Sequence, residues 1–507
     1  MKNSSVFNLI KGMDTSEKRH FNLFSKRHIL GSLNKYTLLF NSMNGMDTEN
    51  DSELIQILQK NEYDATFLAA DKNYLYNQIL RSFQTFHRKK TSTIHLTELL
   101  TTIEILYEKG LYDLCEKETQ KAKKIALEIE NYSFLLEIIN WERKTIGYTQ
   151  GFQKAYEVNS TIKNYLALLS NQIEYTDLYY ESLELRFKDF KARRLDNIEM
   201  FESLLKNPLL QDENLAVTLL SKIRFHLVYS NYYYIKNESK SEYYHLDYLI
   251  KLMEDSSYYI KENPFDYLYI TYYMIELMIK KMPNEVPSAL EKLKEFPARF
   301  DISKRKVSTQ VQAFAYIAEL DWLKEQNKYS EGYQMINEVK FFMSKNNDNI
   351  EPAWHIKFYF LFGSFCIATG NYKKALEFLN HLFNNYKENQ RADYYNYSKL
   401  LVILVHFKLN NFGLIEYIFK NTFLYYKKKN KLFKIEKVVL DFIKEISANQ
   451  SQLRINQKIK NLEQQLLELR GENFEKPAFE LFDIGLWVKS IIENKTMEQL
   501  ANPSQTV

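Results

Sequence analysis

Apolar residues recur three and four positions apart along most of this chain, which is the spacing of one face of an α-helix. The stretch from Trp354 to Phe383 shows the pattern most clearly, because two amphipathic halves are interrupted by Thr369-Gly370-Asn371. Glycine readily adopts the left-handed backbone conformation that ends a helix. The sequence therefore predicts two antiparallel helices over residues 354–383, with the turn at Gly370.

Small residues stand in this stretch where two helix backbones would approach each other. Gly363 lies in the first half and Ala375 in the second. Large apolar residues surround them and would fill the space between the helices: Tyr359, Phe362, Tyr372, Phe378 and Leu379. This alternation of small and large residues predicts a closely packed helical hairpin.

A turn residue, one spacer and an aromatic residue recur in four stretches of the chain. They are Gly110-Leu111-Tyr112, Asn327-Lys328-Tyr329, Gly370-Asn371-Tyr372 and Asn410-Asn411-Phe412. Gly370 follows Asn327 by 43 residues, and Asn410 follows Gly370 by 40. Self-similarity at such a period is typical of helical-repeat proteins, in which each hairpin packs against the next.

These motifs resemble the tetratricopeptide (TPR) repeat, closely over residues 354–383 and loosely over about 94–446. The period exceeds the roughly 34 residues of a standard TPR, and HEAT-like arrays have similar periods. We favour the TPR-like interpretation. The whole chain, including DTSEKRHFNLFSKR and DKNYLYNQILRSF, is also similar to uncharacterised bacterial helical-repeat proteins. The resemblance implies an all-α, TPR-like superhelix, a solenoid of antiparallel hairpins whose concave face binds a protein or peptide.

The chain divides into three predicted parts. Residues 1–90 form an N-terminal helical region, in which Asp14-Thr15-Ser16-Glu17 has the spacing of a helix-starting capping box. Residues 91–446 form the degenerate repeat array. Residues 447–507 hold an amphipathic helix and a short capping helix at about 477–493, followed by a disordered tail.

The C-terminal part carries an apolar heptad seam. Its members alternate at spacings of four and three: Ile455, Ile459, Leu462, Leu466 and Leu469. Because the seam spans only about two heptads, we favour a terminal helix packed on its own chain. A weak homodimer through residues 455–469 is the alternative.

Composition supports long helices in a soluble protein. The chain has only 12 Gly and 8 Pro, too few for the turns of a large β-protein. No apolar segment is long enough for a signal peptide or a membrane span, so we expect a cytoplasmic protein. The two cysteines, Cys115 and Cys366, lie far apart within helical patterns, which predicts buried thiols in a reducing compartment.

Motifs for catalysis, metals or nucleotides do not stand out. Glu17-x-x-His20 and Glu242-x-x-His245 place two possible metal ligands on one helix face. Both lie among charged or polar neighbours, so we interpret them as coincidences on solvated faces. The scattered glycines match no phosphate-binding loop. We therefore expect a protein without enzymatic activity or cofactor.

The alternative function that the sequence leaves open is a regulator that binds nucleic acid through lysine-rich helix ends, or that senses a peptide and alters a DNA-binding partner. Lys427, Lys428, Lys429, Lys431 and Lys434 lie beside aromatic residues, and His87-Arg88-Lys89-Lys90 forms a second basic cluster. Basic and aromatic groups together can hold phosphates and stack on bases. Both clusters fall at predicted helix ends, where cations also interact with the helix dipole. With 68 basic and 64 acidic residues, the chain is nearly neutral, which argues against a nucleic-acid partner.

The predicted concave face gives a set of candidate partner-binding residues on the first helices of three units. They are Ile317, Asp321, Lys324, Lys357, Phe360, Ser364, Leu400 and Leu404. TPR proteins that clamp a C-terminal carboxylate carry Lys and Asn at such positions, and only Lys357 fits that pattern. We therefore expect an apolar groove that binds an unidentified protein or peptide, or that is filled by the chain's own C-terminal segment.

Overall fold

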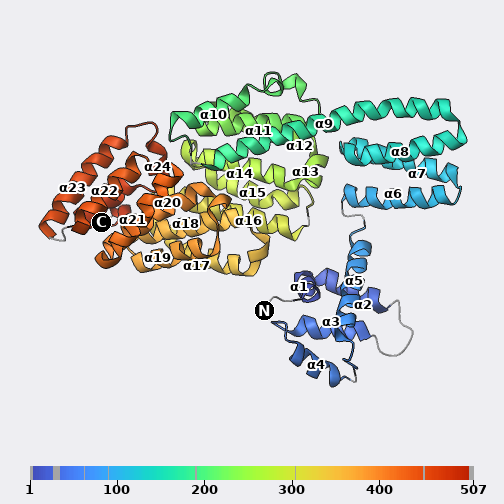
Figure 1. The fold of residues 1–507 in the computed structure, drawn as a ribbon, viewed down its shortest axis with the longest axis horizontal. Helices are drawn as coiled ribbons and strands as arrows, with labels where there is room; N and C mark the ends of the chain where they lie inside the picture. Colours follow the sequence, from blue (N-terminus) through green and yellow to red (C-terminus); the bar gives the residue numbers. More distant parts are fainter. Residues whose placement is uncertain are drawn as a thin grey trace. The chain divides into compact units, whose positions relative to one another are not determined.

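The computed structural model describes residues 4–26, 35–61, 63–88, 91–188, 191–302, 304–448 and 452–501. These residues form α-helices and short 3-10 helices, and no β-strand occurs among them. The chain comprises two compact units, residues 1–166 and 167–507, which are described separately (Figure 1). The predicted all-α class is confirmed, and the predicted boundaries at 90 and 446 stay predictions.

Unit 1 begins with five helices that share one apolar core. They are α1 (Ser5–Gly12), α2 (Thr15–Lys26), α3 (Lys35–Gly45), α4 (Asp51–Gln59) and α5 (Leu68–Phe86). The predicted capping box is present at the start of α2. The Asp14 amide donates to the Glu17 carboxylate at 2.8 Å, and the Glu17 amide donates back to Asp14 at 2.8 Å.

Hairpins follow in the second half of unit 1. They comprise α6 (Ser92–Glu108), α7 (Tyr112–Glu128), α8 (Tyr132–Thr149) and the first part of α9 (Phe152–Lys188). Helix α7 packs on both α6 and α8. Cys115 is buried and lies 3.2 Å from the Thr145 hydroxyl, so its environment is that of a packed helix interior.

Unit 2 continues as a series of sequential helices. They are α10 (Leu195–Leu205), α11 (Leu219–Lys236), α12 (Ser239–Asp255), α13 (Ser257–Glu262), α14 (Pro264–Lys281), α15 (Val286–Arg299), α16 (Arg305–Glu325), α17 (Tyr329–Asn346), α18 (Pro352–Ala368), α19 (Tyr372–Asn385), α20 (Ala392–Lys408) and α21 (Phe412–Lys429). The C-terminal part adds α22 (Lys434–Ala448), α23 (Gln452–Leu469), α24 (Lys476–Leu481), α25 (Ile484–Glu493) and α26 (Met497–Ala501). Packing is mostly between neighbours in sequence, which is consistent with a helical-repeat protein.

All four predicted turns have the expected backbone. The turn residues Gly110, Asn327, Gly370 and Asn410 have φ of 71°, 54°, 79° and 56°. Two positions later, an aromatic residue starts the next helix in every case. Glycine and asparagine tolerate this left-handed conformation better than other residues, which explains why they recur at the turns.

The small residues mark close helix contacts, as the sequence predicts. A Cβ added at Gly363 would come within 2.7 Å of Leu379 across the α18–α19 hairpin. A Cβ added at Gly332 would overlap the ring of Phe365. Both sites therefore need a residue without a side chain for the helices to approach this closely.

Alternate helices of unit 2 also pack on one another. The helices α14, α16, α18 and α20 form this inner row, and α15, α17, α19 and α21 are their hairpin partners. Helix α18 is buried along almost its whole length, including the polar residues His355, Lys357 and Ser364. A helix that is covered on all sides has no free face for a partner.

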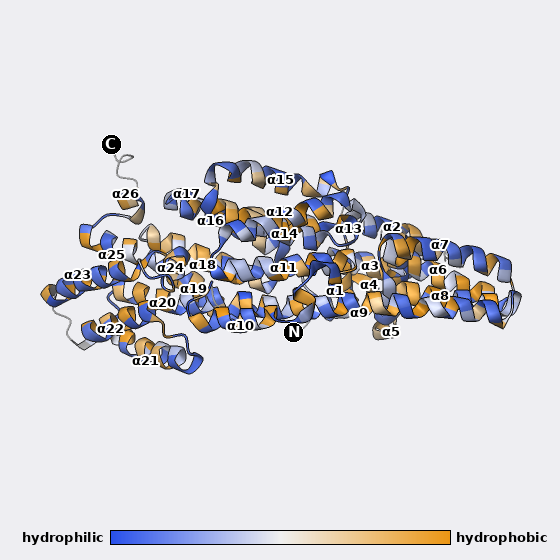
Figure 2. Cartoon of the chain, turned by 90° about the horizontal axis from the view of Figure 1, so that it is seen from above, coloured by the Kyte–Doolittle hydropathy of each residue, from blue (hydrophilic) through white to orange (hydrophobic). Residues whose placement is uncertain are grey.

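The C-terminal helices belong to the core of unit 2. All five residues of the predicted heptad seam are buried, and α23 packs on α22 and α25 within the chain. Leu481, Phe482 and Trp487 join the same apolar core as the inner row. A homodimer through 455–469 stays a prediction, but it would have to use the opposite face of α23. Figure 2 shows hydrophilic and hydrophobic residues interleaved along α22 and α23, the pattern of helices with one buried side.

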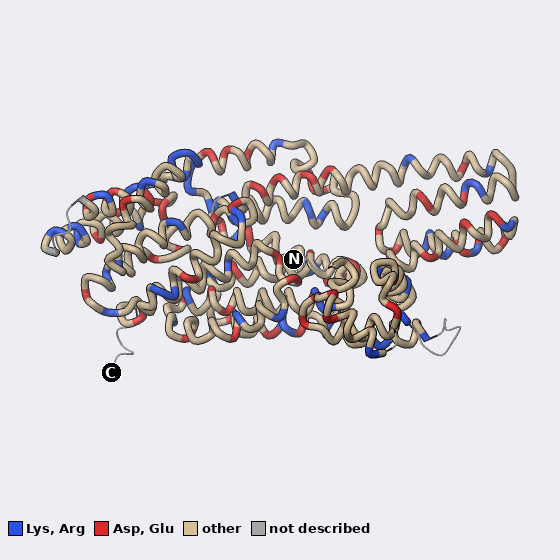
Figure 3. The backbone as a smooth tube through the Cα atoms, turned by 60° about the horizontal axis from the view of Figure 1, so that its bottom comes forward, with Lys and Arg blue, Asp and Glu red and all other residues tan. Residues whose placement is uncertain are grey.

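Charged residues of both signs are distributed along the helices of each unit (Figure 3). No described helix combines the length and apolar character that crossing a membrane requires.

Candidate functional site

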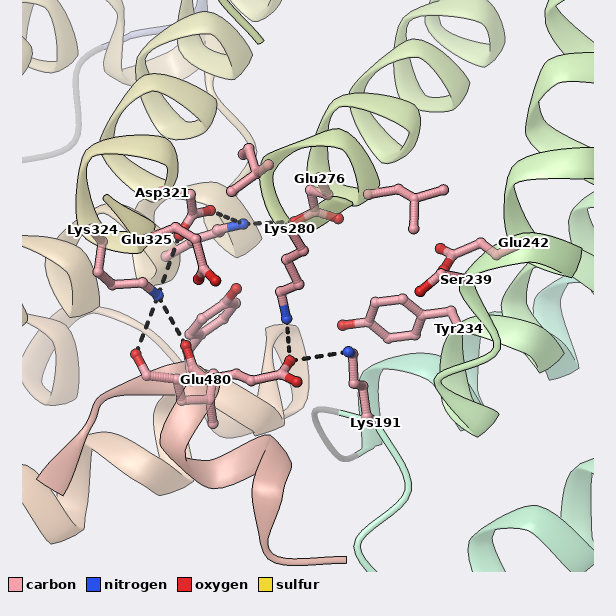
Figure 4. Close-up of a pocket in the computed structure, with 15 residues that line it drawn as sticks. Lys191, Tyr234, Ser239, Glu242, Glu276, Lys280, Asp321, Lys324, Glu325 and Glu480 are labelled. Atoms are coloured by element: carbon pink, nitrogen blue, oxygen red, sulfur yellow. Dashed lines mark hydrogen bonds and ion pairs between the residues drawn. The ribbon is translucent and has the colours of Figure 1, made fainter. Parts of the chain in front are cut away.

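A small cavity in unit 2 brings together charged residues from distant parts of the chain. This cavity, here called the lysine pocket, has a volume of about 60 Å³. Its lining comes from α11, α12, α14, α16, α18, α20, α24 and the segment before α10 (Figure 4): Lys191, Tyr234, Ser239, Glu242, Glu276, Leu277, Ile279, Lys280, Asp321, Lys324, Glu325, Lys357, Tyr394, Glu480 and Leu481. It has room for a few water-sized groups.

Lys357 stands on one wall of the pocket and is 1% exposed. Its ammonium group lies 2.7 Å from Glu276 and 2.7 Å from Asp321, and it donates to the Tyr272 hydroxyl at 2.6 Å. Burial lowers the pKa of Lys357, but Asp321 and Glu276 raise it well above the usual value. A buried cation is stable only with such partners, so this group is fixed as an ammonium.

Glu480 at the end of α24 is the second centre of charge. Its carboxylate pairs with Lys191 at 3.0 Å and also with Lys280. Burial raises the pKa of Glu480, but Lys280 and Lys191 lower it more, to about 2. The pairs connect the C-terminal segment to α14 and to the segment before α10.

Lys324 holds the same end of α24 through its backbone. The ammonium group donates to the carbonyl oxygens of Glu480 at 3.3 Å and Leu481 at 3.2 Å. These are carbonyl groups at a helix C-terminus, where a cation is favourable. The inner row thus already holds a helical segment of its own chain at this point.

Glu242 differs from Glu276, Asp321 and Glu480, which are half-buried and paired with lysines. It is 6% exposed, and within the described part of the chain its carboxylate has no hydrogen bond or ion pair. Burial raises the pKa of Glu242 to about 7, against the lowering effect of Arg186 and Lys191. The predicted position of Glu242 on a solvated face is therefore wrong.

The other member of that Glu-x-x-His motif points elsewhere. His245 is 2.8 Å from His226 between their Nδ1 atoms, and His226 lies 3.2 Å from Glu213. In unit 1, Glu17 pairs with His87 at 2.7 Å and His20 contacts Ser82 at 3.0 Å. In neither Glu-x-x-His motif do the glutamate and the histidine share a partner. Among the described residues, no group of three or more His, Cys, Asp or Glu side chains is arranged to hold a metal ion.

The structure separates the predicted groove residues into two sets. Asp321, Lys324 and Lys357 line the lysine pocket. The remaining five are buried in the core and contact no open surface: Ile317, Phe360, Ser364, Leu400 and Leu404. They are covered because the inner row packs against other parts of the chain on both sides, which the helix pattern by itself did not reveal.

The predicted lysine cluster is largely engaged within the chain. Lys429 pairs with Glu388 at 2.8 Å, and Lys434 pairs with Glu472. Lys431 is buried and donates to the Lys188 carbonyl at 2.7 Å. Lys427 and Lys428 are exposed in the last turn of α21, as predicted for a helix end. In the other basic cluster, Lys89 and Lys90 lie outside the described residues.

Sequence reasoning missed Lys191, Glu242, Glu276, Lys280 and Glu480 as members of one site. A signal for two of the buried charges was nevertheless present. Glu276 stands within the apolar run YITYYMIELMI and Lys357 within WHIKFYFLF. A helix that is apolar on all sides is buried, and a buried charge needs a partner of opposite sign. An ion pair between Glu276 and Lys357 could therefore have been predicted.

A second, larger hollow lies on unit 2 between α12 and α15, with α14 as its floor. This α12–α15 groove has a volume of about 820 Å³. Its apolar lining is Tyr243, Ile250, Tyr267, Met274, Ile275, Met278, Met282, Ala289, Leu293, Phe296 and Phe300. Acidic residues stand among them: Asp247, Glu254, Glu285 and Glu295. Helices α12 and α15 each pack on α14, which leaves the space between them open.

Comparison with known proteins adds no further constraint on the site. No protein-family model matches this sequence, and a search of curated proteins gave no significant match.

Proposed function

We propose that this protein is a non-enzymatic, TPR-like scaffold or adaptor of the cytoplasm that binds another protein or a peptide. The repeated hairpins, their common turn and their sequential packing support a helical-repeat architecture. Such arrays offer long, rigid surfaces for partners. The proposal keeps the predicted function and changes the predicted surface.

The partner surface in this proposal is the α12–α15 groove and not the inner row. The inner row is covered by the chain itself, so a partner would have to displace Leu481, Phe482 and Trp487 from the core. Burial of a large apolar side chain contributes roughly 1.5–3 kcal/mol, so displacing all three is unfavourable. The groove requires no such rearrangement.

The single observation that carries the proposal is the open apolar groove of about 820 Å³. Three methionines, Met274, Met278 and Met282, lie along its floor on one face of α14 and at its end. Methionine side chains are flexible and polarisable and adapt to different partners. The groove thus suits the apolar face of an amphipathic helix or an extended apolar segment.

Site-specific photocrosslinking in the source cells tests this proposal. A photoreactive phenylalanine analogue replaces Tyr243, which is 39% exposed on the groove wall. The matched control carries the analogue at Phe341, which is 66% exposed on α17 outside the groove. The extracts are treated with nuclease before the products are identified.

We expect a reproducible protein adduct from position 243 and none of the same mass from position 341. A second variant, Met278→Lys, should abolish that adduct, because it places a charge on the apolar floor. Equal labelling at both positions would reject the groove as the partner surface. Adducts that disappear with nuclease would favour the nucleic-acid alternative, whose binding should weaken steeply as salt concentration rises.

A further inference from the structure

The lysine pocket contains one buried charge that no described residue of the chain compensates by contact. Each lysine of the pocket has an anionic or carbonyl partner within the chain. Glu276 and Asp321 share Lys357, and Glu480 is held by two lysines. Glu242 has no such partner among the described residues, and it lies on the pocket wall formed by α12 (Figure 4).

The surroundings of Glu242 define what the pocket can accept. The charged and titratable groups that face it come from α9, the segment before α10, α11, α14 and α24: Arg186, Lys191, Tyr234, Glu276, Lys280 and Glu480. Arg186 is held by Glu276 at 3.7 Å and stacks on Tyr234 at 3.8 Å, so it does not reach Glu242. A cation or strong hydrogen-bond donor next to the Glu242 carboxylate would therefore supply the partner that this group lacks among the described residues.

The size and remaining lining restrict that cation further. A volume of about 60 Å³ is too small for a helix or strand of a partner, but it is large enough for the end of one extended side chain or alkyl chain. Leu277, Ile279 and Leu481 offer apolar surface to an aliphatic stem. The rim reaches the surface at Glu325, which is exposed. Each lysine of the pocket already has an anionic or carbonyl partner, so the Glu242 carboxylate is the group that a ligand would meet without a contact.

We infer that the lysine pocket is a binding site for a primary alkylammonium group, with Glu242 as its counter-ion. The group belongs either to a small free amine or to a lysine side chain that a partner inserts. This site is separate from the α12–α15 groove, so it goes beyond the proposed partner surface and can be tested without it.

The protonation state of Glu242 gives the site a pH dependence. The pKa of Glu242 is raised by burial to about 7, so the carboxylate is mostly protonated at pH 6 and mostly ionised at pH 8. An alkylammonium ligand stays charged over this range. Binding should therefore release a proton, and the affinity should rise by about tenfold from pH 6 to pH 8.

The experiment uses the full chain and defined probes in isothermal titration calorimetry. The probes are n-butylamine, Nα-acetyl-lysine N-methylamide and, as an uncharged control, Nα-acetyl-norleucine N-methylamide. Two variants accompany the wild type. Glu242→Gln removes the buried charge and keeps its size, and Glu416→Gln makes the same change at an exposed position of α21 outside the pocket.

We expect saturable binding of at least one cationic probe to the wild type and to Glu416→Gln. Glu242→Gln should weaken it by about tenfold or more, since a hydrogen bond to a charged group is lost. Stronger binding of butylamine would identify a free amine as the ligand. Stronger binding of the lysine derivative would identify a lysine side chain of a partner. Either result supports the site.

Three results would overturn the inference. They are equal binding of the norleucine derivative, unchanged binding by Glu242→Gln, and no binding of either cation to the wild type at pH 8. The pH profile of wild-type binding is an independent measurement, which does not depend on how well the variants fold. A flat profile between pH 6 and pH 8 would remove Glu242 as the counter-ion.

Discussion

Lys357 and Glu276 form an ion pair of 2.7 Å across a separation of 81 residues, between two helices of the inner row. Both are surrounded by apolar helices, and Lys357 is 1% exposed. Burial raises the pKa of Glu276, but Lys357 and Arg186 lower it more, to about 2. With Asp321 of α16 as a second partner of Lys357, the pair ties α14, α16 and α18 together, because a buried charge is stable only with such partners.

Lys357→Met should destabilise unit 2 by about 3–5 kcal/mol, because Glu276 and Asp321 are left buried without their cation. The measurement is urea unfolding followed by tryptophan fluorescence in a Trp141→Phe background, so that Trp322, Trp354 and Trp487 report on unit 2. The control is Lys420→Met, which removes an exposed pair with Glu416; it should change stability by less than about 1 kcal/mol. Equal effects of the two substitutions would contradict a structural role for the buried pair.

Glu480→Gln should weaken unit 2 at pH 7 and have little effect in acid. The pKa of Glu480 is about 2 in the folded chain, below its ordinary value of 4.5. Its stabilisation is thus present above about pH 4.5 and is lost as the pH falls toward 2. A shift of this size corresponds to roughly 3 kcal/mol. Urea unfolding at pH 7, 5, 4 and 3 should show the difference from wild type shrinking steadily; a constant difference would reject the ion pairs as its cause.

Glu242→Gln should have the opposite pH dependence and stabilise the protein. The folded pKa of Glu242 is about 7, above its ordinary value of 4.5. Its ionisation therefore opposes folding, and wild-type stability is lost as the pH rises from about 4.5 through 7. We expect the variant to match wild type at pH 4.5 and to exceed it by up to about 3 kcal/mol at pH 8. Thermal unfolding at both pH values measures this, and lower stability of the variant at pH 8 would contradict the burial of an uncompensated carboxylate.

Gly332→Ala should destabilise the contact between α17 and α18. The added methyl group would overlap the ring of Phe365, which is 1% exposed and cannot move aside. Overpacking of this kind typically costs about 1–3 kcal/mol. The control is Gly413→Ala in α21, where a Cβ would meet nothing within 4 Å. That change should be neutral or stabilising by up to about 1 kcal/mol, and a similar loss at both sites would rule out overpacking as the reason.

The local features of the fold could be read from short stretches of sequence. The capping box at Asp14 and Glu17, the turns at Asn327 and Gly370, and the close crossing at Gly363 are all present. Each depends on residues within one helical turn or one hairpin, where backbone conformation and side-chain size leave few alternatives.

The candidate site could be predicted only in part. The sequence grouped Asp321, Lys324 and Lys357 as candidate groove residues, and the structure places all three in the lining of the lysine pocket. Glu480 was missed because it reaches Lys280 across 200 residues, a separation at which helix periodicity carries no information. Glu242 was misplaced for a similar reason, since its neighbours Lys240 and Tyr243 are exposed and its own burial depends on α9 and α14.

The sequence by itself determined the helices, their turns and their pairing into hairpins, because propensity, capping and the size of contact residues act over short distances. The tertiary structure decided what covers the inner row and which charges meet. Those outcomes follow from how Leu481, Phe482 and Trp487 pack on helices far away in the chain. Burial raises the pKa of both carboxylates, so the contacting cations, and not the residue types, distinguish the paired carboxylate of Glu276 from the uncompensated carboxylate of Glu242.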